Sequence, residues 1–185
     1  MALSQALESN RTLRCLNMGG GLPRKFIGLS DRGIRAIAHA LQCNSSLTYL
    51  DISGHLGSES AVSALGEALQ SICSLTHLYL RGERVSLTRG PFFGYSAAVA
   101  FSKALQSRNA QLTRLDLQST SFSSSCAITL ARALRVNATL ERLDLSFNSI
   151  DCRGAVALAQ ALSTNQTLTH LQLFHNKIGD KIGRA

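Results

Sequence analysis

The sequence predicts an α/β solenoid, a curved right-handed β-α superhelix with a parallel sheet on its concave side and helices on its convex side. Three observations predict it: a leucine block of the Leu-x-x-Leu-x-Leu type that recurs six times, a fundamental period of 28 residues, and a helical pattern before each block. The first leucines of the blocks are Leu13, Leu47, Leu75, Leu112, Leu140 and Leu168. Units of this size bury their apolar faces only by stacking on one another, so the repeats should share one continuous core.

Each leucine block should form a short strand. In LERLDL, residues 140–145, Leu143 and Leu145 alternate with Arg142 and Asp144. Alternation with a period of two places the leucines on one buried face and the polar residues on the other. The same pattern in all six blocks predicts six strands.

The segment before each strand should be a helix. In residues 155–162, AVALAQAL, a broad apolar stripe is formed by Val156, Leu158, Ala159 and Leu162. Asp151 is the predicted N-cap of this helix, and Asn165 suits a left-handed backbone at its exit. A strand and a helix therefore make one repeat.

The chain resembles a known family of repeats. Residues 140–165, LERLDLSFNSIDCRGAVALAQALSTN, and residues 168–183, LTHLQLFHNKIGDKIG, are similar to LxxLxLxxNxIxxxGxxxLAxAL. That pattern is typical of leucine-rich repeats of the ribonuclease-inhibitor type, which also form the repeat domains of NOD-like receptors. The resemblance implies a single leucine-rich repeat domain of about six repeats over residues 1–185. Because neither end carries a polar cap, we expect a fragment of a longer chain or an array that another chain caps.

The resemblance also gives a role to the asparagine after each strand, whose side chain bonds loop backbone groups in the family. Only Asn148 and Asn176 match it, and the equivalent positions hold Gly21, His55, Glu83 and Thr120. We therefore expect the loops of the first four repeats to be held less regularly.

Composition bounds the function. The formal net charge is +8, from 19 Lys and Arg against 11 Asp and Glu, and arginine predominates. Since arginine matches carboxylate and phosphate groups, this bias favours an acidic partner. Five cysteines without a CxxC pair indicate reduced thiols, and no stretch is long and apolar enough for a membrane span. These features predict a cytoplasmic protein.

The concave face follows from the strand pattern, because side chains two, four and six residues after each first leucine should point outward. This face is rich in tyrosine and arginine, which are frequent in the energetic centres of protein interfaces. The alternative is that Arg114 pairs with Asp116, and Arg142 with Asp144, merely to keep an exposed sheet soluble.

Two insertions interrupt the period, within residues 19–26 and 81–96, and both should leave the same rim of the solenoid. Both are basic and aromatic, so they form a clamp beside the concave face in our hypothesis. Alternatively, Phe92 or Phe93 folds into the core. Together with the concave face, the second insertion supplies the predicted partner-binding residues, which are Tyr49, Asp51, His77, Tyr79, Arg81, Arg89, Phe92, Phe93, Arg114, Asp116, Arg142, Asp144, His170 and Phe174.

Several other signals are explained by the repeat. The Asn-x-Ser/Thr matches at Asn10, Asn44, Asn137 and Asn165 each follow a helical pattern in register, so glycosylation is not needed to explain them. The glycines at 19–21 lack the spacing of a phosphate-binding loop, and the histidines form no i, i+4 metal pair. We therefore expect no cofactor and no metal.

The sequence favours a protein-protein interaction scaffold without enzymatic activity. Two alternatives stay open. One is a GTPase-activating or other regulatory module, because the activators of the small GTPase Ran are similar in repeat type. The other is binding of nucleic acid or an acidic surface through the Arg-rich loops.

Overall fold

A computed structural model describes residues 2–20, 29–55, 57–82 and 93–179. Within them, six helices alternate with six strands along the chain. The helices are α1 (Ala2–Ser9), α2 (Asp31–Cys43), α3 (Glu59–Ala68), α4 (Tyr95–Gln106), α5 (Ser124–Leu134) and α6 (Cys152–Leu162). The strands are β1 (Cys15–Asn17), β2 (Tyr49–Asp51), β3 (His77–Tyr79), β4 (Arg114–Asp116), β5 (Arg142–Asp144) and β6 (His170–Gln172).

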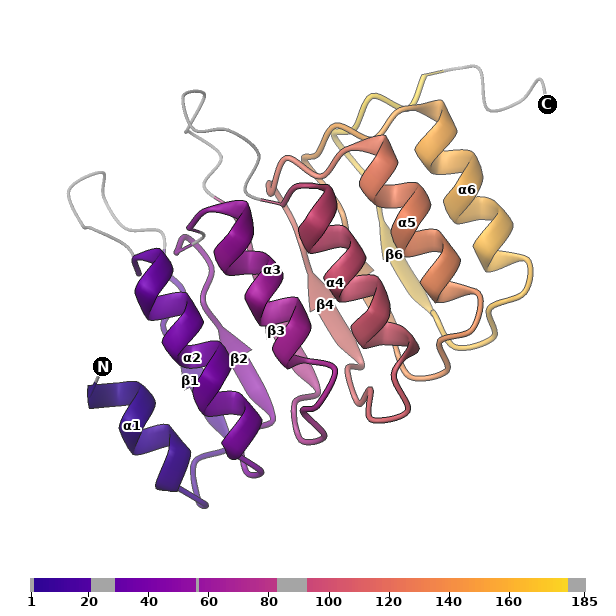
Figure 1. The fold of residues 1–185 in the computed structure, drawn as a ribbon. Helices are drawn as coiled ribbons and strands as arrows, with labels where there is room; N and C mark the ends of the chain where they lie inside the picture. The colour runs from indigo at the N-terminus through magenta and orange to yellow at the C-terminus, as the bar shows by residue number, and fades with distance from the viewer. Residues whose placement is uncertain (1, 21–28, 56, 83–92, 180–185) are drawn as a thin grey trace.

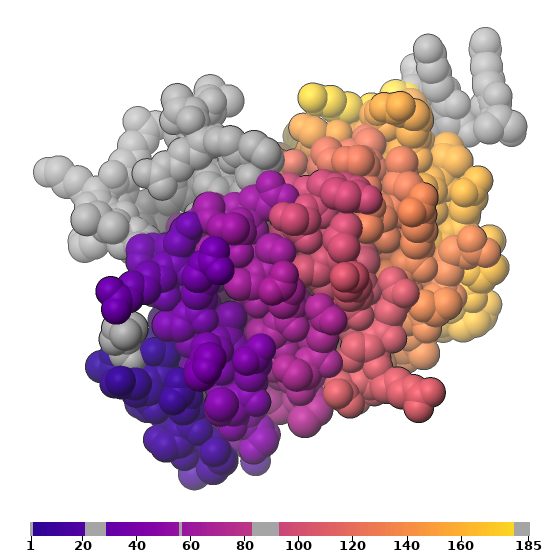
Figure 2. Space-filling model, in the orientation of Figure 1, coloured from indigo at the N-terminus to yellow at the C-terminus, as the bar shows by residue number. Residues whose placement is uncertain are grey.

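The strands form one parallel sheet in the order β1-β2-β3-β4-β5-β6. The helices cover the other side of the array, and α1 and α6 lie at its opposite ends (Figure 1). Seen from the helical side, successive repeats follow one another as bands from indigo to yellow (Figure 2). This confirms the predicted α/β solenoid, with the sheet on the concave side.

The core lies between the sheet and the helices. The central leucines Leu50, Leu78, Leu115 and Leu143 of four neighbouring strands are all buried. Small residues on the helices let neighbouring helices approach closely. A Cβ atom placed on Gly66 of α3 would lie 2.6 Å from Cδ2 of Phe101 on α4. The repeats are therefore joined by a continuous apolar layer.

The stripe predicted for α6 is only partly correct. Leu158 is buried, but Leu162 is exposed, and the other buried residues of this helix are Gly154, Ala155 and Ala161. The helix packs on α5 along its small residues, and the described part of the chain places no helix on its other side. One flank of the expected stripe is therefore open.

Asparagines after the helices tie each repeat to the one before it. Nδ2 of Asn165 donates to the carbonyl oxygens of Leu134 (2.6 Å) and Asn137 (3.0 Å), while its Oδ1 accepts from the Leu168 N–H (2.7 Å). Asn137 makes the equivalent bonds to Leu105 and Leu140. Because these amide groups are engaged inside the array, the glycosylation-like motifs at Asn137 and Asn165 are repeat features. The expected left-handed backbone at Asn165 is wrong, since this residue is not among those with positive φ.

The asparagine after a strand likewise serves the preceding repeat. Nδ2 of Asn148 donates to the carbonyl oxygen of Leu117 (2.9 Å), and its Oδ1 accepts from the N–H of Phe122 (2.8 Å). Asn176 bonds Leu145 and Ile150 in the same way. These bonds satisfy loop backbone groups that would otherwise be unpaired.

His55 takes over this role where the sequence lacks the asparagine. Its Nε2 lies 2.8 Å from the carbonyl oxygen of Met18, and its Nδ1 accepts from the N–H of Leu29 (3.2 Å). At this position an imidazole supplies the donor and the acceptor that the amide of Asn148 supplies in its own repeat. Gly21 and Glu83 lie outside the described residues.

The concave face as candidate binding site

The strand register confirms that the side chains two and four residues after each first leucine form two columns across the sheet. The first column runs across the sheet through Cys15, Tyr49, His77, Arg114, Arg142 and His170. The second runs through Asn17, Asp51, Tyr79, Asp116, Asp144 and Gln172. The central residue between them faces the core in each strand, so the two columns point away from it.

Aromatic and basic side chains gather where β2, β3 and β4 meet. The rings of Tyr49 and Tyr79 have centroids 5.1 Å apart, and the ring of His77 stacks on Tyr49 at 6.1 Å. Cζ of Arg114 lies 5.2 Å from the centroid of Tyr79, and Cζ of Arg81 lies 6.0 Å from it. Both distances suit a cation-π contact. We call Tyr49, His77, Tyr79, Arg81 and Arg114 the aromatic-basic cluster.

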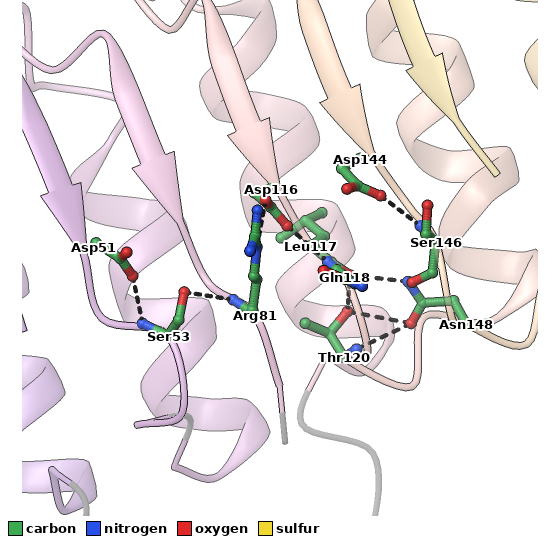
Figure 3. A network of polar contacts seen from close by, with 10 residues as sticks. All are labelled: Asp51, Ser53, Arg81, Asp116, Leu117, Gln118, Thr120, Asp144, Ser146 and Asn148. Atoms are coloured by element: carbon green, nitrogen blue, oxygen red, sulfur yellow. Dashed lines mark hydrogen bonds and ion pairs between the residues drawn. The ribbon is translucent and has the colours of Figure 1, made fainter. Parts of the chain in front are cut away.

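The guanidinium of Arg81 also forms an ion pair with the carboxylate of Asp116 (Figure 3). Its Nε donates to Oδ2 of Asp116 at 2.7 Å, and the N–H of Gln118 donates to Oδ1 of the same carboxylate. Burial raises the pKa of Asp116, while the bond from Arg81 opposes that rise. Only 1% of Asp116 is exposed, so this predicted contact residue is closed to a partner.

The alternative ion pairs of the concave face do not form. In the described part of the chain, the ion pairs join Arg81 to Asp116, Arg153 to Asp151, and His39 to Glu8. Oδ1 of Asp144 instead accepts from the N–H of Ser146 at 2.8 Å, as Oδ1 of Asp51 does from Ser53 at 2.9 Å. Each carboxylate therefore holds the loop that follows its own strand (Figure 3).

A shallow hollow opens on the concave face across β4, β5 and β6. It is open to solvent, and its volume of about 290 Å³ includes the solvent above the surface. Its lining residues are Arg114, Leu115, Arg142, Leu143, Asp144, His170 and Gln172. Four of the predicted site residues thus line a single depression.

Phe93, a predicted contact residue, belongs to the core. It is fully buried, and its ring lies 5.0 Å from that of Phe101 and 5.2 Å from that of Phe122. The prediction that it faces a partner is therefore wrong, and the alternative of a core residue is correct. The position of Phe93 could have been predicted by counting residues from the first leucine of its block. When the insertion of about eight residues is left out, Phe93 occupies the position that Phe122 and Ile150 hold in the next repeats. Arg89 and Phe92, and with them the proposed clamp, lie outside the described residues.

Phe174 lies beyond the sheet and is 49% exposed. It meets Phe147 edge to face at 5.0 Å, and the imidazole of His175 stacks on Phe147 at 4.3 Å. Phe147 and His175 have φ values of 55° and 54°, a conformation that bulky side chains rarely adopt. The sequence pattern did not single out Phe147 and His175, which stand where other repeats have Gly54 and Ser119.

Other kinds of site find little support. All five cysteines are free thiols, and the described residues hold no group of three His, Cys, Asp or Glu side chains suited to a metal. None of the described helices has the length and apolar character needed to cross a membrane. The concave face is thus the most developed candidate site.

A family model described as Leucine Rich repeat matches residues 136–159 and 164–185. The chain contains leucine-rich repeats. Among solved structures, the tropomodulin C-terminal domain of Caenorhabditis elegans is similar, with a TM-score of 0.60 and 19% identity over 89% of this chain and 91% of that one. A leiomodin-1 structure, actin-binding site 2, gives a TM-score of 0.49 and 13% identity over 92% and 76% of the two chains.

A search of curated proteins finds no match. At 19% identity, the likeness to tropomodulin shows a shared leucine-rich repeat fold. The ribonuclease-inhibitor subtype, and the likeness to NOD-like receptors, stay predictions.

Proposed function

We propose that this leucine-rich repeat array is a protein-protein interaction scaffold that binds a protein partner through its concave face. The observation that carries the proposal is the aromatic-basic cluster. Tyrosine and arginine concentrate binding energy at interfaces because they combine large contact areas with directional polar groups. Here Tyr49, Tyr79 and Arg114 stand on adjacent strands of one sheet, and Arg81 lies two residues after β3.

The sheet supports binding by holding these side chains in place before a partner arrives. Tyr49, Tyr79 and Arg114 come from three strands joined by parallel pairing, and Arg81 is held by the buried Asp116. A preorganised surface loses less conformational freedom on association, which favours affinity. A surface of this kind needs no catalytic group, so we infer binding and not enzymatic activity.

The fold likeness supports a binding scaffold in general and no particular partner. No observation on the described residues favours the GTPase-activating alternative. The Arg-rich loops invoked for nucleic acid lie largely outside the described residues. The five free thiols suit a reducing compartment, which supports the proposed cytoplasmic location.

A paired capture experiment tests the proposal. The immobilised protein and two double variants are incubated with cell extract, and the bound proteins are quantified by mass spectrometry. Tyr49→Ser with Tyr79→Ser alters the concave face. Tyr95→Ser with Val136→Ser is the matched control, because both of those side chains are exposed outside the sheet.

We expect a direct binder that the concave variant loses by roughly tenfold or more and that the control keeps. The binder is then purified and titrated against all three proteins. Equal capture by the three proteins, with native circular dichroism for each, would overturn the proposal.

A further inference from the structure

We infer that the concave face receives an acidic segment of its protein partner along four neighbouring side chains, His77, Arg114, Arg142 and His170. We call these residues the basic row. The inference rests on the proposed function and adds the chemistry of the partner. The strand register places the four residues side by side on β3, β4, β5 and β6.

The basic row concentrates positive charge. Neighbouring parallel strands lie about 4.8 Å apart, so the row extends over roughly 14 Å. Like charges directly opposite each other on a sheet are destabilising. Arg114 and Arg142 stand in this relation, and no carboxylate among the described residues pairs with either. An anionic ligand would relieve this repulsion.

Asp116 and Asp144, the acidic residues of the second column on β4 and β5, do not neutralise the row. Asp116 is buried, and its negative charge is paired with the guanidinium of Arg81. Asp144 lines the same hollow as Arg114 and Arg142, but one of its oxygens is taken by the N–H of Ser146. Two arginines and a histidine thus face one partly engaged carboxylate.

Both histidines are oriented by a neighbouring threonine. The Oγ1 of Thr76 donates to the carbonyl oxygen of Thr48 (2.9 Å), so it accepts from Nδ1 of His77, also at 2.9 Å. Thr169 holds His170 in the same way at 2.8 Å, while donating to the carbonyl of Glu141. Because the Nδ1–H group is engaged by the threonine, Nε2 is the ring nitrogen left for a ligand. In the imidazolium form, Nε2 carries a hydrogen and can donate it to an anion.

The shape of the row selects a segment with several carboxylates over a single anion. An arginine fork binds a carboxylate through two parallel hydrogen bonds. On an extended peptide, side chains on one face recur about every 6.7 Å, and on a helix residues i and i+4 lie about 5 to 6 Å apart. Either spacing lets two acidic side chains reach Arg114 and Arg142 together. The rings of Tyr49 and Tyr79 beside Arg114 then offer contact to an apolar neighbour.

Titration with a labelled peptide tests the inference. The probe is a fluorescent twelve-residue peptide of alternating Glu and Ala, and its Gln counterpart reports contacts that need no charge. The test variant is Arg114→Gln with Arg142→Gln. The matched control is Arg132→Gln with Arg135→Gln, which removes the same charge from exposed positions at the end of α5.

By fluorescence anisotropy at low salt, we expect the Glu peptide to bind the wild type and to lose at least about tenfold in affinity with the test variant. The control should stay within about twofold, and the Gln peptide should not bind. Equal losses in both variants would show attraction by net charge alone and would overturn the inference, as would no binding of the Glu peptide.

A single-stranded RNA of equal charge is titrated in parallel. If it binds more tightly than the Glu peptide and depends on the same arginines, the row is a nucleic-acid surface and the inference fails. The outcome is separable from the proposed function. A partner that is lost on substitution of Tyr49 and Tyr79, but kept without Arg114 and Arg142, would support the scaffold while overturning the acidic segment.

Discussion

At the scale of single residues, Phe93 shows how the array accommodates its larger insertion. The ring fills the core position that Phe122 holds in the next repeat, and the N–H of Phe93 donates to the carbonyl of Thr120 at 3.2 Å. The thiol of Cys126 lies 3.7 Å from the carbonyl oxygen of Phe93. The chain therefore re-enters the regular repeat at this residue, whatever the length of the loop before it.

Substitution of Phe93 by alanine should be strongly destabilising. A buried phenylalanine replaced by alanine leaves a cavity and costs about 3 to 5 kcal/mol in free energy of unfolding. Urea denaturation measures this, with Phe174→Ala as the control, because the exposed Phe174 should cost less than about 1 kcal/mol. Similar losses for the two variants would contradict the assignment of Phe93 to the core.

At the scale of elements, the start of one helix supports the start of the next. The carboxylate of Asp31, the first residue of α2, accepts from both the N–H and the hydroxyl of Ser58 before α3. Glu59, the first residue of α3, accepts from the N–H of Ser96 in α4 (2.8 Å). The hydroxyl of Ser124, the first residue of α5, accepts from the N–H of Asp151 (2.8 Å). Helix capping is thus shared between repeats.

The carboxylate of Asp151, the N-cap of α6, makes the stabilisation of this helix start depend on pH. The hydroxyl of Ser124, the N–H groups of Gly154 and Arg153 and the side chain of Arg153 lower its pKa from 3.8 to about 2. Because the folded pKa is depressed, the stabilisation is present above the unfolded pKa and is lost as the pH falls through about 2.

Asp151→Asn provides the test, since asparagine can cap the helix but does not titrate. The melting temperature of both proteins is followed from roughly pH 5 to pH 2. We expect the wild type to be the more stable at the upper end and the difference to shrink as the pH falls. A difference that is constant over this range would show that the carboxylate charge contributes nothing.

At the scale of the whole molecule, stability depends on contacts between neighbouring repeats. Helix α3 packs on α4, where a Cβ atom on Gly66 would lie 2.6 Å from Phe101 and 2.9 Å from Ala100. In a solenoid each repeat touches mainly its neighbours, so a defect at one interface uncouples the two sides. The close approach at Gly66 therefore holds the two halves of the array together.

Gly66→Val should separate the unfolding of the two halves. Overpacking at this interface costs about 1 to 3 kcal/mol, and the variant should show earlier amide exchange in α2 and α3 than in α5 and α6. Hydrogen exchange followed by mass spectrometry measures this. Gly20→Val is the control, because no atom lies within 4 Å of a Cβ placed there. Uniform loss of protection along the chain would contradict the local coupling.

Much of the concave face could be predicted because a strand alternates its side chains between two faces, whatever the rest of the chain does. The column that contains Tyr49 and Arg142 follows from that rule and the period. The ion-pair partners of the side chains on this face could not be predicted from the same rule. Arg81 reaches Asp116 on the neighbouring strand, 35 positions along the chain, whereas the expected pairs joined residues two apart on one strand.

By itself, the sequence determined the repeat, the class of fold and the residues that line the concave face, because these depend on local periodicity. Only the tertiary structure decided which of those residues are available. It buried Asp116 under Arg81, placed Phe93 in the core, let His55 replace an asparagine and left Arg114 and Arg142 without carboxylate partners among the described residues. Burial and pairing depend on residues brought together from different repeats, and no period in the sequence specifies those contacts.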